Sequence, residues 1–213
     1  MPRVFRIDLG TTPKWNPGQM RDHLKFIAGF LRRPRAVGAV APSSERLARE
    51  VLRYSALRDV STVVELGAGT GAITREILDH VNPRARVIVV EVDAQHAELL
   101  TQRFPSAMVC HDSAENLRAI LRRHGCRGAD VIVSGLPWAS MPRPVRERIK
   151  AEILASLKPD GRLCGFGYVH ATWHPKIREF HEELRSSFSR VRVSPVVWAN
   201  LPPAFAYDLA GPC

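Results

Sequence analysis

Three glycines and a carboxylate stand close together at residues 65–71, which read ELGAGTG. Glycine lets the backbone turn sharply and lets a ligand approach closer than a Cβ would allow. Gly67, Gly69 and Ala72 also fit the G-x-G-x-x-G/A spacing of a nicotinamide dinucleotide site. Glu65 argues against that ligand, because its carboxylate would repel a pyrophosphate. A carboxylate beside this loop suits a cationic ligand part, such as the ammonium group of a methionine moiety.

Two further carboxylates end the next two apolar runs. Glu91 lies 24 residues after Gly67, about where an acidic side chain accepts both ribose hydroxyls of an adenosine. Asp112 could accept a hydrogen bond from the exocyclic amine of adenine, with Ala114 leaving room for the ring. Asp112 could instead cap a helix together with Ser113. Three acidic residues ending three successive strands favour a nucleoside site.

A fourth run ends in Ser134-Gly135-Leu136-Pro137-Trp138. A glycine and a proline directly after a buried strand hold an extended turn whose backbone carbonyls face outward. Trp138 is expected to offer a flat wall beside those carbonyls, or else to cap the core as a buried aromatic. The turn is therefore a candidate for binding a substrate that donates hydrogen bonds to these carbonyls.

An alternation of short apolar runs and helical stretches must position these residues. The predicted strands are 62–64, 86–92, 107–110, 130–134 and 162–169, and the predicted helices are 72–80, 94–104, 114–124, 145–157 and 175 to about 188. Unalternated apolar strands separated by helices indicate a parallel sheet covered on both faces. Such sheets bind ligands at the carboxyl ends of their strands, where these motifs fall.

The chain closes with two more strand-like runs, 191–198 and 204–209, which the break Asn200-Leu201-Pro202-Pro203 separates. This break predicts an antiparallel hairpin. The expected fold is α/β: a mostly parallel, Rossmann-like seven-stranded sheet with helices on both faces, a C-terminal antiparallel hairpin and additional N-terminal helices.

The N-terminal quarter has a different character. Residues 1–58 hold 12 of the 31 Lys and Arg but only four of the 21 Asp and Glu. Residues 1–17 read as an irregular arm, 19–33 as an amphipathic helix that stops at Pro34, and Ser43 as the N-cap of a helix running to about Ala56. We therefore divide the chain into an arm with basic helices, 1–58, and a ligand-binding domain, 59–213.

Composition limits the function classes. With 213 residues, of which 45% are hydrophobic and 24% charged, the chain is an ordinary folded domain. A formal charge of +10 favours an acidic partner. Four widely spaced cysteines give no metal-binding pattern. The start lacks the apolar core of a secretion signal, and no apolar run approaches the about 20 residues that cross a bilayer. We expect a cytoplasmic protein that can rest on a membrane.

The four motifs together resemble those of class I S-adenosylmethionine-dependent methyltransferases. Residues 34–44 (PRAVGAVAPSS), 134–137 (SGLP) and 200–207 (NLPPAFAY) narrow this resemblance. With them, the chain resembles the bacterial phospholipid N-methyltransferase family, which methylates phosphatidylethanolamine, from about residue 26 to residue 207. Two positions depart from that family. Trp138 stands where a second leucine is common, and Tyr168-Val169 stands in place of Tyr-Gly.

The resemblance implies S-adenosylmethionine as cofactor and no metal. The implied cofactor contacts are Ser43, Ser44, Glu65, Gly67, Ala68, Gly69, Thr70, Gly71, Glu91, Val92, Asp112, Ser113, Ala114, Ser134, Gly135 and Leu136. Ser134 stands where amine-methylating enzymes keep an Asn or Asp, and together with Trp138 and Tyr168 it is an implied catalytic residue. Tyr168 would orient the acceptor ammonium by cation–π contact. Tyr168, His170 and His174 are the candidates for taking the proton of the acceptor amine, with Tyr168 preferred because it matches the tyrosine of the family, and a water could take the proton instead.

The methyl acceptor and the partners follow from the same resemblance. A phospholipid amine is the expected substrate, reached when the basic amphipathic segment 19–35 docks on an anionic membrane surface. That segment could instead act only as a lid over the cofactor. The alternatives are an rRNA adenine N6-dimethyltransferase, which a basic N-terminal region would suit, a small-molecule methyltransferase, and a non-catalytic adenosine-binding module. Against the rRNA enzyme, the turn after residue 134 lacks the expected asparagine. The oligomeric state stays open.

Overall fold

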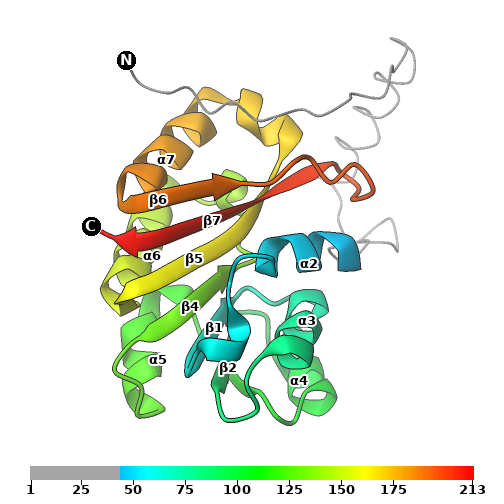
Figure 1. The fold of residues 1–213 in the computed structure, drawn as a ribbon, viewed down its shortest axis with the longest axis vertical. Helices are drawn as coiled ribbons and strands as arrows, with labels where there is room; N and C mark the ends of the chain where they lie inside the picture. Colours follow the sequence, from blue (N-terminus) through cyan, green and yellow to red (C-terminus); the bar gives the residue numbers. More distant parts are fainter. Residues whose placement is uncertain (1–43) are drawn as a thin grey trace.

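The computed structural model describes residues 44–213, apart from the side chains of Ser140 and Lys176 (Figure 1). The expected N-terminal arm, the amphipathic segment 19–35 and Ser43 lie outside the described residues. The boundary proposed at residue 58 stays a prediction.

One seven-stranded sheet forms the centre of the described part of the chain, in the order β3-β2-β1-β4-β5-β7-β6. The strands are β1 (Thr62–Leu66), β2 (Arg86–Glu91), β3 (Met108–His111), β4 (Ala129–Ser134), β5 (Leu157–Tyr168), β6 (Phe188–Val193) and β7 (Ala204–Pro212). β1 to β5 pair in parallel, whereas β7 is antiparallel to both β5 and β6. The predicted parallel sheet and its antiparallel C-terminal hairpin are confirmed.

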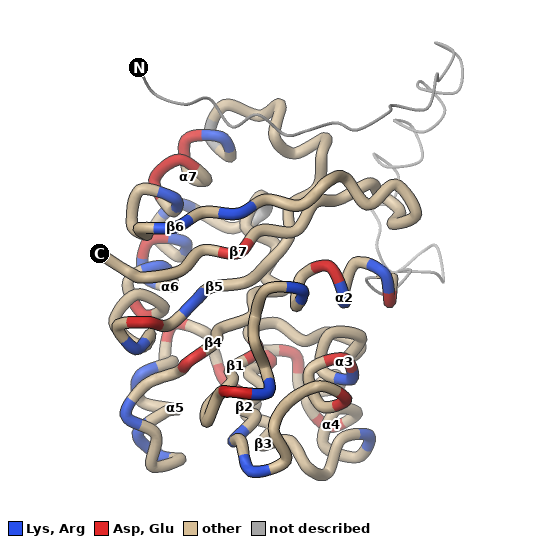
Figure 2. Tube along the Cα trace, in the orientation of Figure 1, with Lys and Arg blue, Asp and Glu red and all other residues tan. Residues whose placement is uncertain are grey.

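Helices cover both faces of this sheet, as Figure 1 shows. The α-helices are α2 (Glu45–Leu52), α3 (Ala72–His80), α4 (Ala94–Arg103), α5 (Leu117–Arg123), α6 (Arg143–Ser156) and α7 (Pro175–Ser186). Short 3-10 helices lie at η1 (Leu57–Asp59), η2 (Ala114–Asn116), η3 (Trp138–Ser140) and η4 (Val169–Trp173). The charged residues of α5 are all arginines, Arg118, Arg122 and Arg123 (Figure 2).

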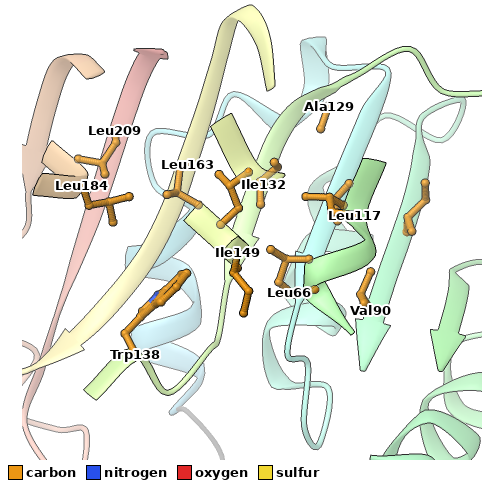
Figure 3. Close-up of a cluster of buried hydrophobic side chains, with 14 of the residues drawn as sticks. Leu66, Val90, Leu117, Ala129, Ile132, Trp138, Ile149, Leu163, Leu184 and Leu209 are labelled. Atoms are coloured by element: carbon orange, nitrogen blue, oxygen red, sulfur yellow. The ribbon is translucent and has the colours of Figure 1, made fainter. Parts of the chain in front are cut away.

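Two apolar clusters hold the layers together, one on each face of the sheet. Helices α2, α3 and α4 bury residues such as Leu47, Ile77 and Leu100 against one face. Helices α5, α6 and α7 bury the other cluster, which includes Ile149 and Leu184 (Figure 3). Both faces of the central strands are buried, which is why the strands read as continuous apolar runs.

Several predicted boundaries were wrong. The N-cap of α2 is Ser44, whose hydroxyl accepts a hydrogen bond from the amide of Leu47, and the helix ends at Leu52 instead of residue 56. The helix expected at 114–124 begins as the 3-10 turn η2 before α5. β6 ends at Val193, because Ser194 and Pro195 follow and proline cannot donate to a ladder.

The length and hydropathy of the helices in residues 44–213 bear on whether this part of the chain could cross a membrane. No helix in this part combines the length and the apolar character that crossing a bilayer requires.

A candidate active site at the carboxyl edge of the sheet

The residues singled out in the sequence come together at one edge of the sheet. Glu65 is the penultimate residue of β1, Glu91 ends β2 and Asp112 directly follows β3. Ser134 ends β4 and Tyr168 ends β5. Because these five strands run parallel and are neighbours, their carboxyl ends form one continuous edge, where open α/β sheets bind ligands.

The glycine loop between β1 and α3 has a backbone that glycine alone adopts easily. Gly67, Gly69 and Gly71 have φ angles of 72°, 53° and 82°. A Cβ at Gly71 would lie 2.5 Å from the ring of Phe104, whereas a Cβ at Gly69 would meet nothing within 4 Å. Phe104 therefore leaves no room for a side chain at Gly71, whereas the space beside Gly69 is open.

Glu91 holds this loop in place. Its Oε2 accepts a 2.8 Å hydrogen bond from the amide of Gly69, and its Oε1 accepts one of 3.0 Å from the amide of Asp93. Each carboxylate oxygen can accept more than one hydrogen bond. Glu91 can therefore keep both backbone contacts and still accept ribose hydroxyls, as predicted for it.

Glu65 is fully buried beneath the loop. Its Oε2 accepts a 2.6 Å hydrogen bond from the hydroxyl of Thr74, while its Oε1 has no hydrogen-bond partner among the described residues. Burial raises the pKa of Glu65 to about 7, an effect that the Thr74 hydrogen bond opposes and the charge of Glu91 increases. A buried carboxylate with one unused oxygen is suited to a cationic partner.

Asp112 occupies the third position of this edge, next to Glu91. Its amide donates a 3.1 Å hydrogen bond to the carbonyl of Glu91. Its carboxylate accepts hydrogen bonds from Asn116 and from the amide of Ser113, and it forms a 2.6 Å ion pair with Arg123. The hydrogen bond from Asn116, followed by the contacts with Arg123 and Ser113, lowers the pKa of Asp112. The helix cap at this point is Ser113, whose hydroxyl accepts from the amide of Glu115.

The turn after β4 packs directly against the glycine loop. The amide of Gly135 donates a 2.8 Å hydrogen bond to the carbonyl of Leu66, and a Cβ at Gly135 would lie 2.5 Å from the carbonyl oxygen of Gly67. Ser134 is buried, and its hydroxyl accepts from the amide of Leu136. The backbone of this turn therefore has no room for a side chain at residue 135.

Trp138 and Tyr168 lie near the ends of β4 and β5, each against a second aromatic ring. Trp138 is buried, and its ring packs 5.0 Å from that of Phe180. Figure 3 shows Trp138 near Ile149 and Leu163. The ring of Tyr168 stacks on His170 at 5.7 Å. The exposed wall expected of Trp138 is therefore absent, because the ring packs into the core.

Comparisons with known proteins decide the family. Residues 63–161 match the model of a methyltransferase domain. An ornithine lipid N-methyltransferase of Singulisphaera acidiphila is 34% identical over 195 residues, which cover 90% of this chain and 97% of that protein. The chain belongs to the class I S-adenosylmethionine-dependent methyltransferases.

Two further similarities cover less of the sequence or have a lower identity. A ribosomal RNA small subunit methyltransferase A of Thermotoga neapolitana is 29% identical over 131 residues, which cover 60% of this chain and 46% of that protein. The solved structure of the N-methyltransferase NodS from Bradyrhizobium japonicum WM9 has a TM-score of 0.64 at 15% identity, covering 82% of this chain and 99% of that one. The expected class I methyltransferase fold is confirmed.

The described residues fit the cofactor that the family implies. The unused, buried Oε1 of Glu65 suits the ammonium group of S-adenosylmethionine, and the open space at Gly69 admits a ligand close to the backbone. Val92, which directly follows Glu91, is largely exposed, and Ala114 is small. Ala68 and Thr70 lie in the loop itself, while Ser44 caps α2. The individual contacts of these residues with the cofactor stay predictions.

Burial determines the ionisation of two side chains at the end of β5 and directly after it, Tyr168 and His170. Burial raises the pKa of the Tyr168 phenol and lowers the pKa of His170. Both side chains are therefore neutral at pH 7. The Nδ1 atom of His170 is buried and has no hydrogen-bond partner among residues 44–213. His174 is exposed at the start of α7, which favours His170 over His174 as a proton acceptor.

Sequence reasoning missed three residues that shape this site. Thr74 binds Glu65, Arg123 pairs with Asp112, and Arg146 donates to the carbonyl of Trp138. Thr74 could have been found, because a threonine in the first turn of the helix after a glycine loop is close to the preceding strand end. The other two depend on how α5 and α6 pack, which local patterns do not show.

A hollow of about 470 Å³ lies elsewhere, at the opposite edge of the sheet. The C-terminal parts of α5 and α6 line it, with residues such as Arg122 and Ser156, together with Arg127 in the connection between α5 and β4. None of the predicted catalytic or cofactor-binding residues belongs to this hollow, so it is separate from the candidate active site.

Proposed function

We propose that this methyltransferase transfers a methyl group from S-adenosylmethionine to the amine of a lipid head group at a membrane surface. The observation that carries this proposal is the extent of the similarity to the ornithine lipid enzyme, which spans 97% of that protein at 34% identity. The rRNA enzyme is matched over only 131 residues, less than half of its length. A match of that extent is what a shared nucleoside-binding core alone would produce.

The turn after β4 supports a lipid amine over adenine. An rRNA adenine methyltransferase is expected to carry an asparagine here. Ser134 is buried and already accepts a hydrogen bond, and Gly135 has no room for a Cβ. Because no amide side chain stands at this turn, an amine acceptor would be oriented by other groups, and the aromatic ring of Tyr168 at the end of β5 suits an ammonium group.

The chemistry required of the chain is modest. S-adenosylmethionine supplies an electrophilic methyl group that a neutral amine attacks in line. Glu65, Glu91 and the glycine loop would hold the cofactor, and the buried turn at Ser134 would exclude water from the reacting atoms. The acceptor amine arrives protonated, so it must lose a proton before it reacts. Neutral His170, with an unused Nδ1, would accept this proton, and the stacked Tyr168 would orient the ammonium.

Exposed apolar residues near the same edge support contact with a membrane. Trp173 lies in η4, directly after β5, and is 67% exposed. Trp198 and Leu201, in the connection between β6 and β7, are also exposed. This connection lies at the same edge, because Ala204 at the start of β7 pairs with Tyr168 at the end of β5. Tryptophan is favoured at membrane–water interfaces. Together with the basic segment 19–35, these loops would seat the active site on an anionic bilayer.

A methyl-transfer assay tests the proposal. The full-length protein receives radiolabelled S-adenosylmethionine and, in parallel reactions, anionic vesicles with ornithine lipid, the same vesicles with phosphatidylethanolamine, and total RNA. We expect label in at least one lipid and none in RNA, and the labelled lipid identifies the head group. Label in RNA alone, or no label in either lipid, would refute the proposal.

A further inference from the structure

The hollow of about 470 Å³ lies where α5 leads into β4 and α6 leads into β5, at the edge of the sheet opposite to the candidate active site. Arg118, Arg122 and Arg127 line it together with Cys126 and Ser156, and none of the described residues that line it is acidic. Guanidinium groups are planar donors that match the oxygens of anions. The composition of this hollow therefore suits an anionic ligand.

The carboxylate next to the hollow is already paired. Glu152 on α6 accepts hydrogen bonds of 2.9 Å and 2.8 Å from the amide and Nε of Arg118, and it forms a 2.6 Å ion pair with Nη2 of the same arginine. Burial opposes the ionisation of Glu152, but the hydrogen bonds from Arg118 and, to a smaller extent, the charge of Arg122 lower its pKa. Arg122 and Arg127 form no ion pair with a carboxylate in the described part of the chain. Both are exposed, so their donors can reach a ligand.

Arg86 on β2 offsets the negative end of α5 beside the hollow. Carbonyl groups at a helix C-terminus carry partial negative charge and disfavour an anion. Nη1 of Arg86 donates 3.1 Å hydrogen bonds to the carbonyls of His124 and Gly125, which directly follow the helix. The carbonyls of residues 120–122 accept hydrogen bonds from the amides of residues 124–126. These carbonyl groups are therefore engaged, and Arg86 adds positive charge next to the hollow.

Ser156 gives a second, independent indication of a ligand. It ends α6, lines the hollow and is only 2% exposed. Its hydroxyl has no hydrogen-bond partner within residues 44–213, so it does not bond back to a carbonyl of its own helix as helical serines often do. Buried hydroxyls nearly always have a partner, because an unsatisfied one loses its bonds to water without replacement. The unused hydroxyl in the wall of a basic hollow therefore indicates that a ligand oxygen binds there.

We propose that this hollow binds the phosphate group of a small, water-soluble ligand, at a site separate from that of S-adenosylmethionine. Arg122 and Arg127 would donate to the phosphate oxygens, and the Ser156 hydroxyl would donate a further hydrogen bond. A phosphate is favoured over a carboxylate because its three terminal oxygens can serve donors from several directions. Pockets of this volume accommodate an organic part beside the phosphate.

The position of the hollow favours a soluble ligand over a lipid head group. The exposed Trp173 and Trp198, which are proposed to contact the membrane, lie at the carboxyl edge of the sheet. The hollow lies at the opposite edge, so it would face away from a bilayer that those residues contact. The phosphate site does not depend on the identity of the methyl acceptor.

Binding is measured on the full-length ¹⁵N-labelled protein at constant ionic strength. The backbone amide signals of Gly125 and Cys126, two residues that line the hollow, are followed during titration with inorganic phosphate, with glycerol 3-phosphate and with glycerol. We expect saturable shifts with at least one of the two phosphates, also in the presence of saturating S-adenosylmethionine, and none with glycerol. Unmoved signals with both phosphates, or equal shifts with glycerol, would overturn the site.

Three variants test which side chains bind the phosphate. Arg127→Met should weaken phosphate binding at least fivefold. The matched control Arg84→Met, which removes an exposed arginine before β2 at the same edge of the sheet, should change it less than twofold. Ser156→Ala should weaken binding at least threefold without lowering stability in urea, because alanine removes an unpaired buried hydroxyl. Phosphate affinities of Arg127→Met or Ser156→Ala equal to that of Arg84→Met would contradict the site.

Flotation with vesicles that contain phosphatidic acid, and binding of total RNA, test the competing ligands. We expect Arg127→Met to bind both as the wild type does. If Arg127→Met lowers vesicle or RNA binding and neither soluble phosphate binds the wild type, the hollow is a docking surface for that partner and the proposal is overturned. None of these measurements requires methyl transfer, so a failure of the proposed function would not affect them.

Discussion

The backbone amide of Ser44 donates a 3.0 Å hydrogen bond to Oδ1 of Asn200, which lies 156 residues later in the chain. Nδ2 of Asn200 donates a 2.7 Å hydrogen bond to the carbonyl of Pro202. Asn200 is buried; its hydrogen bond to Pro202 is buried as well, and the one from Ser44 is partly buried. One side chain thus fastens the start of α2 to the connection between β6 and β7. Two motifs that the family resemblance had singled out separately, at opposite ends of the chain, meet in this contact.

Asn200→Ala should therefore destabilise the protein. Removing these two hydrogen bonds, of about 1 kcal/mol each, predicts a loss of about 2 kcal/mol in the free energy of unfolding, measured by urea denaturation. The matched control is Asn82→Ala, whose side-chain hydrogen bonds are exposed, and it should lose less than half as much. Equal losses for the two variants would show that the Asn200 contacts do not fasten α2.

Two glycines of the loop should respond differently to alanine. Gly71→Ala places a Cβ against Phe104 and keeps a positive φ, so it should cost about 3 kcal/mol of stability. Gly69→Ala carries only the cost of the positive φ, about 1 kcal/mol, because nothing lies within 4 Å of its Cβ. Gly69→Ala should still weaken cofactor binding at least tenfold by calorimetry, because its Cβ enters the ligand space. Unchanged affinity would remove Gly69 from the cofactor site.

Glu65 should make the stability of the cofactor-free protein depend on pH. Its pKa is raised from 4.5 to about 7, so between these values the native state keeps a proton that the unfolded chain releases. The free energy of unfolding therefore falls as pH rises through this window, by about 3 kcal/mol in total, and then stays constant. Glu65→Gln should remove this fall and be more stable than the wild type at pH 8, while binding the cofactor more weakly.

Urea denaturation between pH 4.5 and pH 8 checks this expectation. The control is Glu98→Gln on the exposed surface of α4, which should follow the wild-type curve. A Glu65→Gln variant that also follows the wild-type curve would mean that Glu65 is ionised in the native state without cost.

His170 should shape the acidic side of the pH–rate profile. Burial lowers the pKa of His170 below its ordinary 6.5, so the imidazole is neutral above that pH and the rate should be flat there. The rate should fall only at more acidic pH, where His170 is protonated and cannot accept the amine proton. His170→Asn should lower kcat at least tenfold, whereas the surface variant His80→Asn should match the wild type. A kcat unaffected by His170→Asn would exclude His170 as the proton acceptor.

Local patterns predicted most of the fold. α3 was predicted residue for residue, because its apolar spacing and the preceding glycine loop are local signals. β5 begins five residues earlier than predicted, because Leu157 pairs with Ala129 across an irregularity in the β4–β5 ladder. The first and last residues of β6 are determined by its pairing with β7. Strand ends of this kind depend on partners that are distant in sequence, so they could not be predicted from local patterns.

The candidate site was predictable in position but not in its contacts. The spacing of Glu65, Glu91 and Asp112 was enough to place three carboxylates at neighbouring strand ends. The sequence did not show that Glu91 binds the amide of Gly69 or that Arg123 pairs with Asp112. It also did not show that Trp138 is buried, since an aromatic after a strand fits either a core or a ligand wall.

Calorimetric titration of S-adenosylmethionine into the wild type and into Glu91→Ala tests the central claim most directly. We predict that the wild type binds the cofactor and that Glu91→Ala loses at least a hundredfold in affinity, with Glu98→Gln unchanged and circular dichroism showing that all three proteins are folded. A wild type that does not bind the cofactor, or a folded Glu91→Ala that binds it as tightly as the wild type, would contradict the assignment of this edge of the sheet as the cofactor site.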